Sequence, residues 1–333
     1  MKIIQKLTAA ALCVLMLTSA LVSCGHSNNK AKDKPLSIVA TIFPEYDWVR
    51  QIAGDRAENM DITLLLDNGV DLHSYQSTAD DIIKISNCDM FIYVGGESDE
   101  WVHDALKEAV NKDMVVINLL DVLGNTVKEE EIVPGMEAEE EDEDEEDEED
   151  EEDETEYDEH VWLSLKNASV LCRYIADKLC ELDPSHEAIY SQNVNAYVEK
   201  LNALDAEYQS VVEQAPVKTV LFGDRFPFRY LVDDYGLSYY AAFVGCSAET
   251  EASFETIIFL ANRVDELGLH AILQIESSDG SIARTVRDNT KTKDQSILTM
   301  DSLQSATSKD AANGVTYLSV MEENLSVLKD ALQ

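Results

Sequence analysis

Short runs of β-branched and other apolar residues alternate with amphipathic helical segments along both halves of the chain, and this alternation limits the fold more than any other sequence feature. The runs that we expect to form strands are 37–42, 61–66, 90–94, 114–118, 218–222, 239–243, 271–275 and 297–300. Parallel strands need a crossover between them, usually a helix. This order therefore predicts an α/β protein with mostly parallel sheets and flanking helices.

One helical segment between the two halves is unusually long. Asp183 and Pro184 are a typical N-cap and first helical residue, and apolar residues then recur every three to five positions. At 1.5 Å per residue, a helix over 183–215 would be roughly 45 Å long. We therefore expect two lobes, 36–182 and 216–333, joined by one long rigid helix.

The N-terminus has the features of a targeting segment. Two lysines precede an apolar run over 7–22, which is too short for a comfortable membrane span. The sequence at 21–24 resembles a bacterial lipoprotein box, so we expect a signal peptide over 1–23 and a lipidated Cys24. An ordinary secretory signal is the alternative. The polar residues 24–35 then form a tether between the membrane anchor and the folded domain.

Acidic residues dominate one segment of this chain, whose formal net charge is -41. Between Glu137 and Glu159 all but three residues are Asp or Glu. Such a segment has no core-forming pattern, so we expect a disordered loop over 137–157. The charge argues against binding of nucleic acid and for attraction of cations. Weak cation collection and a merely solvating role are both open for this loop.

Four cysteines follow the N-terminal segment: Cys88, Cys172, Cys180 and Cys246. No two of them form a Cys-x-x-Cys pair, which argues against a cysteine-based zinc site or a thioredoxin-like motif. Their pairing is open, and we expect buried free thiols.

Residues that could bind a metal follow expected strands in both halves. His73 and His160 lie in the first half, and each has an acidic neighbour. Asp224, Glu276 and Asp301 follow strands of the second half. Ligands bind beyond the carboxyl ends of strands in open α/β sheets. A mixed nitrogen and oxygen site between the lobes would suit zinc, manganese or iron better than calcium.

These segments resemble the zinc- and manganese-binding substrate-binding proteins of bacterial ABC metal importers, over roughly residues 36–330. The second histidine motif is similar to an Asp-x-His-x-Trp-Leu pattern of that family. The segments that carry the resemblance are Val39-Ala40-Thr41-Ile42-Phe43-Pro44, Asp71-Leu72-His73-Ser74-Tyr75, Asp158-Glu159-His160-Val161-Trp162-Leu163, Ile275-Glu276-Ser277-Ser278 and Thr299-Met300-Asp301-Ser302.

The resemblance implies four metal ligands. His73 and His160 match the two family histidines of the first lobe, and Asp301 matches the last ligand. Gly223 stands where the family usually has a histidine or glutamate, so Asp224 is the nearest side chain able to act as a ligand. The alternative ligands or partners of the ligands are Glu249, Glu276 and Arg225. Two histidines with two carboxylates favour manganese, although zinc also accepts aspartate.

The function implied is that of a monomeric, lipid-anchored receptor outside the cytoplasm. It would capture zinc or manganese between its lobes and deliver the ion to an ABC permease with its ATPase. Affinity should fall as the pH drops through roughly 6.5, because histidine ligands must be neutral.

No His-Glu-x-x-His helix or nucleophile elbow occurs, which argues against an enzyme. The alternatives are an extracytoplasmic metalloprotein, such as a metalloenzyme, and a surface adhesin or calcium-binding protein that uses the acidic loop.

Overall fold

The computed structural model describes residues 34–137, 156–247 and 251–333. Residues Leu36–Gln333 form one compact unit. The predicted signal peptide, Cys24, most of the tether, most of the acidic segment and Glu249 lie outside the described residues. Within the described part of the chain, no helix is both long enough and apolar enough to cross a membrane.

The first sheet has the parallel arrangement that the sequence predicts. Its strand order is β2-β1-β3-β4, and every neighbouring pair is parallel. The strands are β1 (Ser37–Ala40), β2 (Asp61–Leu64), β3 (Met90–Tyr93) and β4 (Val115–Asn118). The helices between and after them are α2 (Phe43–Ala53), α3 (Ala79–Asn87), α4 (Trp101–Lys107), α5 (Leu119–Leu123) and α6 (Leu165–Leu182). The strand ends carry the loops that hold His73 and other site residues.

The second lobe is also built from parallel pairs, β5 with β7, β9 with β10, and β6 with β8. A parallel bridge from Phe222 to Leu273 connects the first two pairs. The strands are β5 (Thr219–Leu221), β6 (Arg225–Phe226), β7 (Ser238–Tyr240), β8 (Phe243–Val244), β9 (Ala271–Ile275) and β10 (Ser296–Met300). The helices are α8 (Arg229–Tyr235), α9 (Phe254–Leu267), α10 (Ser281–Asn289), α11 (Ser308–Ala312) and α12 (Tyr317–Ala331). The predicted α/β fold class is confirmed.

One predicted strand of the second lobe was wrong in its extent. The segment 239–243 is divided between β7 and β8. The strand that pairs with this segment is interrupted as well. The Phe222 amide donates to Tyr240 O at the end of the β5–β7 pair, whereas the Ala242 amide donates to Asp224 O at the start of the β6–β8 pair. This break lets β8 pair with β6 and directs the residues after β8 toward the first lobe.

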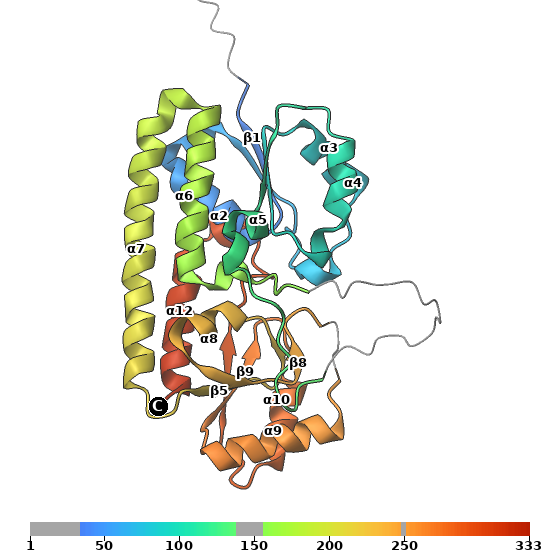
Figure 1. Ribbon diagram of the computed structural model, residues 1–333, viewed down its shortest axis with the longest axis vertical. Helices are drawn as coiled ribbons and strands as arrows, with labels where there is room; N and C mark the ends of the chain where they lie inside the picture. The colour runs from blue at the N-terminus through green and yellow to red at the C-terminus, as the bar shows by residue number, and fades with distance from the viewer. Residues whose placement is uncertain (1–33, 138–155, 248–250) are drawn as a thin grey trace, which may run out of the picture. The chain divides into compact units, whose positions relative to one another are not determined.

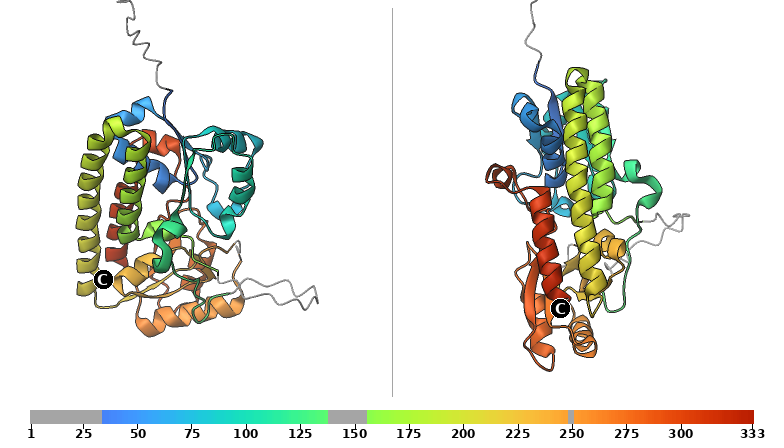
Figure 2. Two further views of the ribbon diagram at one scale, coloured as in Figure 1. Left: turned by 45° about the horizontal axis from the view of Figure 1, so that its top comes forward. Right: turned by 90° about the vertical axis from the view of Figure 1, so that its left-hand side faces the viewer.

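The long helix α7 (Glu187–Gln214) lies beside α6 and α2 in one part of its length and beside α8 and α12 in another (Figures 1 and 2). It begins later than predicted because Pro184–His186 forms a 3-10 turn. Its buried face includes Tyr190, Val194, Tyr197, Leu201 and Tyr208. The helix therefore packs against elements of both lobes.

The two lobes share one continuous apolar core. Trp48 and Trp162 are fully buried in it. Tyr317 of α12 packs edge-on against Trp48, and its hydroxyl donates to Trp162 O at 2.6 Å. The Trp162 indole in turn donates to Ser302 O at 2.8 Å. Burial of each large side chain contributes about 1.5–3 kcal/mol, so these contacts hold the second lobe firmly against the first.

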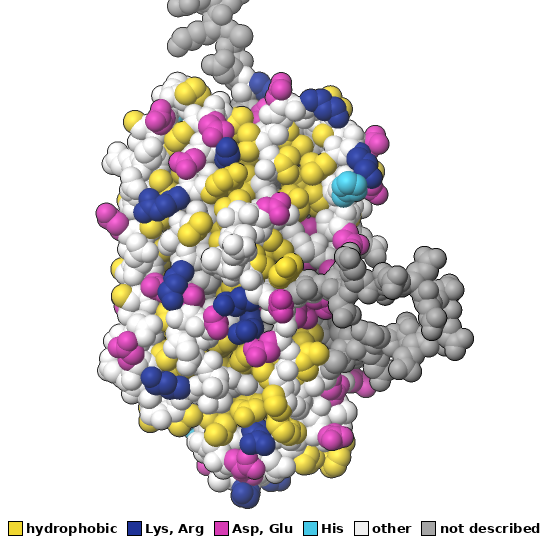
Figure 3. Space-filling view, viewed as in Figure 1, with side chains coloured by type: hydrophobic (Ala, Val, Ile, Leu, Met, Phe, Trp, Pro, Cys, Tyr) yellow, Lys and Arg dark blue, Asp and Glu magenta, His cyan; other side chains and the backbone are white. Residues whose placement is uncertain are grey.

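The surface view shows acidic and basic side chains mixed across one face rather than gathered in a single patch (Figure 3). Polar contacts also cross between the lobes, including two from Ser308 to Asp67 at 2.6 Å. None of the four cysteines in the described residues forms a disulfide; Cys88 and Cys172 are buried as expected, whereas Cys180 and Cys246 are only partly buried.

Candidate metal site

His73 is held in a 3-10 turn, Leu72–Ser74, in the loop after β2. Asp71 caps this turn, because its Oδ1 accepts a hydrogen bond from the His73 amide at 3.0 Å. The His73 Nδ1 lies 2.7 Å from Ser98 Oγ. With Nδ1 engaged in this way, Nε2 is the ring nitrogen that remains for a metal.

His160 is positioned in a similar way, by the aspartate two residues before it. Asp158 Oδ1 accepts from the His160 amide at 2.8 Å and lies 3.1 Å from His160 Nδ1. The ring is fully buried and lies against Trp162, with a centroid separation of 5.2 Å. Its Nε2 faces the Nε2 of His73 at 3.2 Å. The two histidines of the first lobe therefore present their free nitrogens to one point.

Cys246 of the second lobe reaches the same point. The donor atoms of His73, His160 and Cys246 all lie within 4.8 Å of one another, and we call these three residues the donor group. Cys246 follows β8 and Gly245. A Cβ atom on Gly245 would lie 2.9 Å from His160 Cε1 and 2.9 Å from Phe226 O. A glycine at 245 is therefore what lets this loop approach the His160 ring so closely.

Burial and neighbouring charged groups set the protonation states of the donor group. Burial lowers the pKa of His73 well below its usual range, with the nearby His160 adding to the effect, so its ring is neutral. Burial also lowers the pKa of His160, but Asp158, Asp71 and Glu159 together outweigh it and the net pKa is raised. Burial, together with Glu130, keeps the Cys246 thiol protonated by raising its pKa. A bound metal ion would reverse this, because a coordinated thiol is deprotonated.

The two predicted carboxylate ligands lie elsewhere in the second lobe. Asp224 Oδ1 accepts from the Arg225 amide at 2.9 Å, and its Oδ2 accepts from the Ile275 amide at 3.3 Å. Asp301 Oδ1 accepts from the Leu303 amide at 2.7 Å. Both carboxylates thus bind backbone amides at strand ends. The structure does not bring either of them into the donor group, as far as the described residues are concerned.

The other predicted residues have different surroundings. Glu276 accepts from Ser302 N and Ser302 Oγ, both at 2.8 Å. Burial, with Glu276 nearby, raises the pKa of Asp301. Arg225 forms an ion pair with Asp71 of the first lobe at 2.6 Å. Glu276 therefore orders the loop after β10, whereas Arg225 connects the two lobes next to His73.

Sequence reasoning missed Cys246 and Gln304. Cys246 follows a strand end, in a segment where the sequence predicts only Glu249 as a possible ligand. Gln304 Nε2 lies 3.4 Å from His160 Nε2, and its buried Oε1 has no hydrogen-bond partner among the described residues. The oxygen and nitrogen of a carboxamide exchange places by a half turn, and that turn would direct the Gln304 oxygen toward the donor group. No sequence signal marks Gln304.

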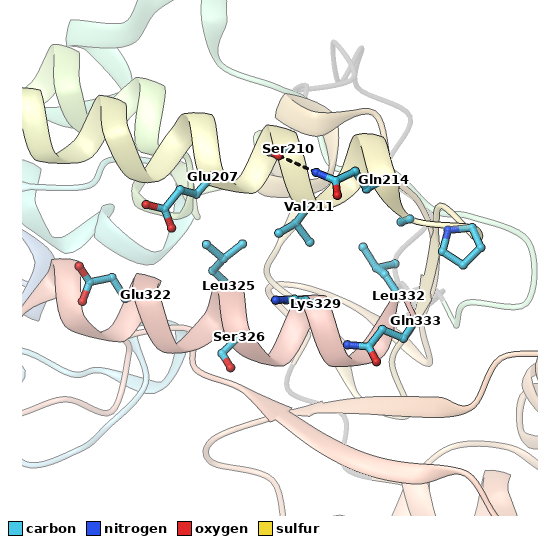
Figure 4. A pocket seen from close by; sticks show the side chains of 12 residues that line it. Glu207, Ser210, Val211, Gln214, Glu322, Leu325, Ser326, Lys329, Leu332 and Gln333 are labelled. Carbon is cyan, nitrogen blue, oxygen red and sulfur yellow. Dashed lines mark hydrogen bonds between the residues drawn. The ribbon is translucent and has the colours of Figure 1, made fainter.

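A polar groove of about 420 Å³ lies beside the donor group. Its walls come from both lobes and include Asp71, Ser74, Asp224, Arg225 and Ser247. A second groove, of about 550 Å³, lies between α7 and α12 (Figure 4). Neither lining includes a histidine or a cysteine, but Ser74 and Ser247 of the first groove directly follow His73 and Cys246, so the first groove is the one next to the donor group.

The chain belongs to the family described as zinc-uptake complex component A, periplasmic (ZnuA), which matches residues 38–331. Members of this family are described as components of zinc-uptake complexes. This membership confirms the predicted family resemblance.

Individual relatives agree with this assignment. The chain is 34% identical to the zinc-binding lipoprotein AdcA of Streptococcus pneumoniae, over 97% of this chain and 60% of that protein. It is 29% identical to the high-affinity zinc uptake system protein ZnuA of Bacillus subtilis, over 97% and 95%. The chain therefore spans only about three fifths of the length of the streptococcal relative.

The fold is also that of solved structures. The Zn(II)-bound ZnuA-like domain of Streptococcus pneumoniae AdcA matches with a TM-score of 0.68 and 29% identity, over 90% of this chain and 99% of that one. Streptococcus pneumoniae AdcAII matches with a TM-score of 0.70 and 27% identity, over 90% and 100%.

Proposed function

We propose that this protein captures Zn²⁺ between its two lobes, with His73 Nε2, His160 Nε2 and Cys246 Sγ as donors. The observation that carries the proposal is the meeting of three such atoms, from both lobes, within 4.8 Å. Two nitrogens bound to a tetrahedral zinc ion lie about 3.3 Å apart. The two Nε2 atoms lie 3.2 Å apart, which is the spacing that this ion requires.

The donor types favour zinc over manganese. Thiolate and imidazole are good ligands for zinc, whereas manganese prefers carboxylate, carbonyl and water oxygens. The preference for manganese predicted from the sequence depends on Asp224 and Asp301 as ligands, and the carboxylates of both residues bind backbone amides instead. The relatives named above are described as zinc-binding or zinc-uptake proteins, which supports the same cargo.

Capture then proceeds without large rearrangement. The ion enters from the polar groove and meets two histidines that are already oriented by Ser98 and Asp158. Cys246 loses its proton as the metal binds. The fourth position of a tetrahedral ion is left to the Gln304 carboxamide oxygen or to water.

The place of action and the partners belong to the same proposal. The N-terminal sequence pattern and the description of a relative as a lipoprotein support a lipid-anchored protein outside the cytoplasm. The family description supports delivery of the ion to an ABC permease with its ATPase. We propose that the receptor acts as a monomer.

Calorimetric titration of the metal-stripped chain with zinc and with manganese tests this function. We expect 1:1 submicromolar zinc binding that is lost in His73→Ala/His160→Ala. His103→Ala, which removes an exposed histidine of α4, serves as the control and should bind like the wild type. Weak binding at many sites that survives the double substitution would overturn the proposal. Tighter binding of manganese than of zinc would overturn the assignment of the cargo.

A further inference from the structure

Arg225 connects the loops that carry the metal donors of the two lobes. Its Nη2 lies 2.6 Å from Asp71 Oδ2, and its Nη1 donates to Ser247 O at 3.3 Å. Asp71 stands two residues before His73, and Ser247 directly follows Cys246. The two charged side chains are only 15% and 17% exposed, so solvent screens the pair weakly.

Asp71 has a carboxylate within reach of an ion at the donor group. Its Oδ1 is 3.9 Å from His73 Nε2. Two ligands of one tetrahedral zinc ion lie about 3.3 Å apart, so a small rotation of the Asp71 side chain would make it a ligand. The ion pair with Arg225 opposes that rotation, because it holds the other carboxylate oxygen toward the second lobe.

The backbone of Arg225 is held by its own lobe. Arg225 lies in β6, paired with Phe243 of β8, and β8 leads to Cys246. The Arg225 amide donates to Asp224 Oδ1 at 2.9 Å, and Asp224 Oδ2 accepts from the end of β9. The predicted ligand Asp224 thus anchors the residue that engages Asp71.

We propose that Arg225 determines metal specificity by keeping the Asp71 carboxylate out of the coordination of the captured ion. The inference rests on the proposed function, since it concerns the ion at His73, His160 and Cys246. With Asp71 paired, the protein offers two imidazoles and a thiolate, which is a set that suits zinc. With Asp71 released, an oxygen ligand is added, and a harder ion such as manganese gains more than zinc does.

The ratio of the two affinities is the quantity to measure. Loss of the Arg225 charge strengthens the attraction of the site for every divalent cation, and this common gain cancels in the ratio of the manganese and zinc dissociation constants. Zinc and manganese titrations of the metal-stripped chain would compare the wild type with Arg225→Gln, Asp71→Asn and the double variant. Arg56→Gln removes another partly buried Arg–Asp pair, with Asp183 at 3.6 Å, and is the matched control.

We expect the manganese-to-zinc ratio to fall at least about tenfold in Arg225→Gln, a change of the size seen when partners of metal ligands are altered. The double variant should return to the wild-type ratio, because the carboxamide introduced by Asp71→Asn is a weaker oxygen donor than a carboxylate. Arg56→Gln should not change the ratio. The absorption of bound cobalt should weaken in Arg225→Gln, as its coordination number rises above four. An unchanged ratio in Arg225→Gln, or a fall that persists in the double variant, would overturn the proposal.

Asp71→Asn alone tests the inference even where Arg225→Gln does not fold. We expect Asp71→Asn to keep the manganese-to-zinc ratio of the wild type, because the paired carboxylate is not a ligand and the carboxamide oxygen can still accept from the His73 amide. A loss of zinc affinity beyond about 100-fold in this variant would show that Asp71 already ligates the ion, and would overturn the proposal. Absence of 1:1 zinc binding in the wild type would instead refute the proposed function itself.

Discussion

Glu45 of α2 is a fully buried carboxyl group at the end of β1, and its replacement by glutamine should stabilise the protein. Its Oε2 accepts hydrogen bonds from Thr41 N, Thr41 Oγ1 and Ile42 N. Its Oε1 is buried without a partner in the described structure. A glutamine keeps one acceptor oxygen for the three donors and removes the ionisable group.

The expected size follows from the pKa of Glu45. Burial, together with the charge of Asp99, raises this pKa from 4.5 to about 8. The raised pKa means that the protonated carboxyl group is favoured in the folded protein, so its contribution to the stability of the fold is complete below the unfolded-state pKa of about 4.5. This contribution is lost as the pH rises from about 4.5 to about 8. At about 1.36 kcal/mol per pH unit, wild-type folding loses about 1 kcal/mol by pH 5 and about 3 kcal/mol by pH 7. Glu45→Gln avoids this loss.

Urea unfolding at the two pH values measures the effect. The gain in the free energy of unfolding of Glu45→Gln over the wild type should grow by about 2 kcal/mol from pH 5 to pH 7. Glu199→Gln, on the exposed face of α7, is the control for removal of one negative charge from a chain of net charge -41. A gain that does not depend on pH, or a Glu45→Gln variant less stable than the wild type at pH 7, would refute the reasoning.

Cys246→Ser should weaken zinc binding and abolish the thiolate-to-cobalt absorption of the cobalt-loaded chain, and an unchanged spectrum would exclude Cys246 as a ligand. Gly245→Ala should weaken zinc binding about tenfold or more, because the new Cβ would lie 2.9 Å from His160 Cε1; wild-type affinity in a titration would mean that the loop has room to shift. Asp158→Asn should weaken zinc binding by about 10- to 100-fold, since a neutral carboxamide is a weaker partner of His160 Nδ1 than the carboxylate is. Asp158 also raises the pKa of His160 against the opposing effect of burial, and a protonated ring cannot bind a metal. Zinc affinity should therefore fall as the pH decreases through that raised pKa, and Asp158→Asn should move the fall to lower pH; a midpoint that stays in place in pH-dependent titrations would contradict this.

The sheets and the two histidines could be predicted because their signals are local. Alternating strands and helices lead to parallel sheets, and His73 and His160 stand in short turns that their own neighbours Asp71 and Asp158 cap. The sequence around each histidine therefore specifies both its place and its orientation.

Cys246, the donor that we propose from the second lobe, could not be predicted in the same way. Asp224 and Asp301 stand at strand ends, where carboxylates also serve nearby backbone amides, and both do so here. Whether Cys246 meets the histidines depends on the break between β7 and β8 and on the close approach of Gly245 to His160. Both are tertiary contacts between distant segments, which a sequence pattern does not reveal.

The place of α12 determines when a newly made chain finishes folding. Tyr317 lies against Trp48, and its amide donates to Asp47 of α2 at 2.9 Å, so the core of the first lobe is completed by residues near the opposite end of the described chain. A polypeptide that ends after the first lobe lacks Tyr317, so its core is incomplete beside Trp48. That polypeptide gains its full stability only after α12 arrives.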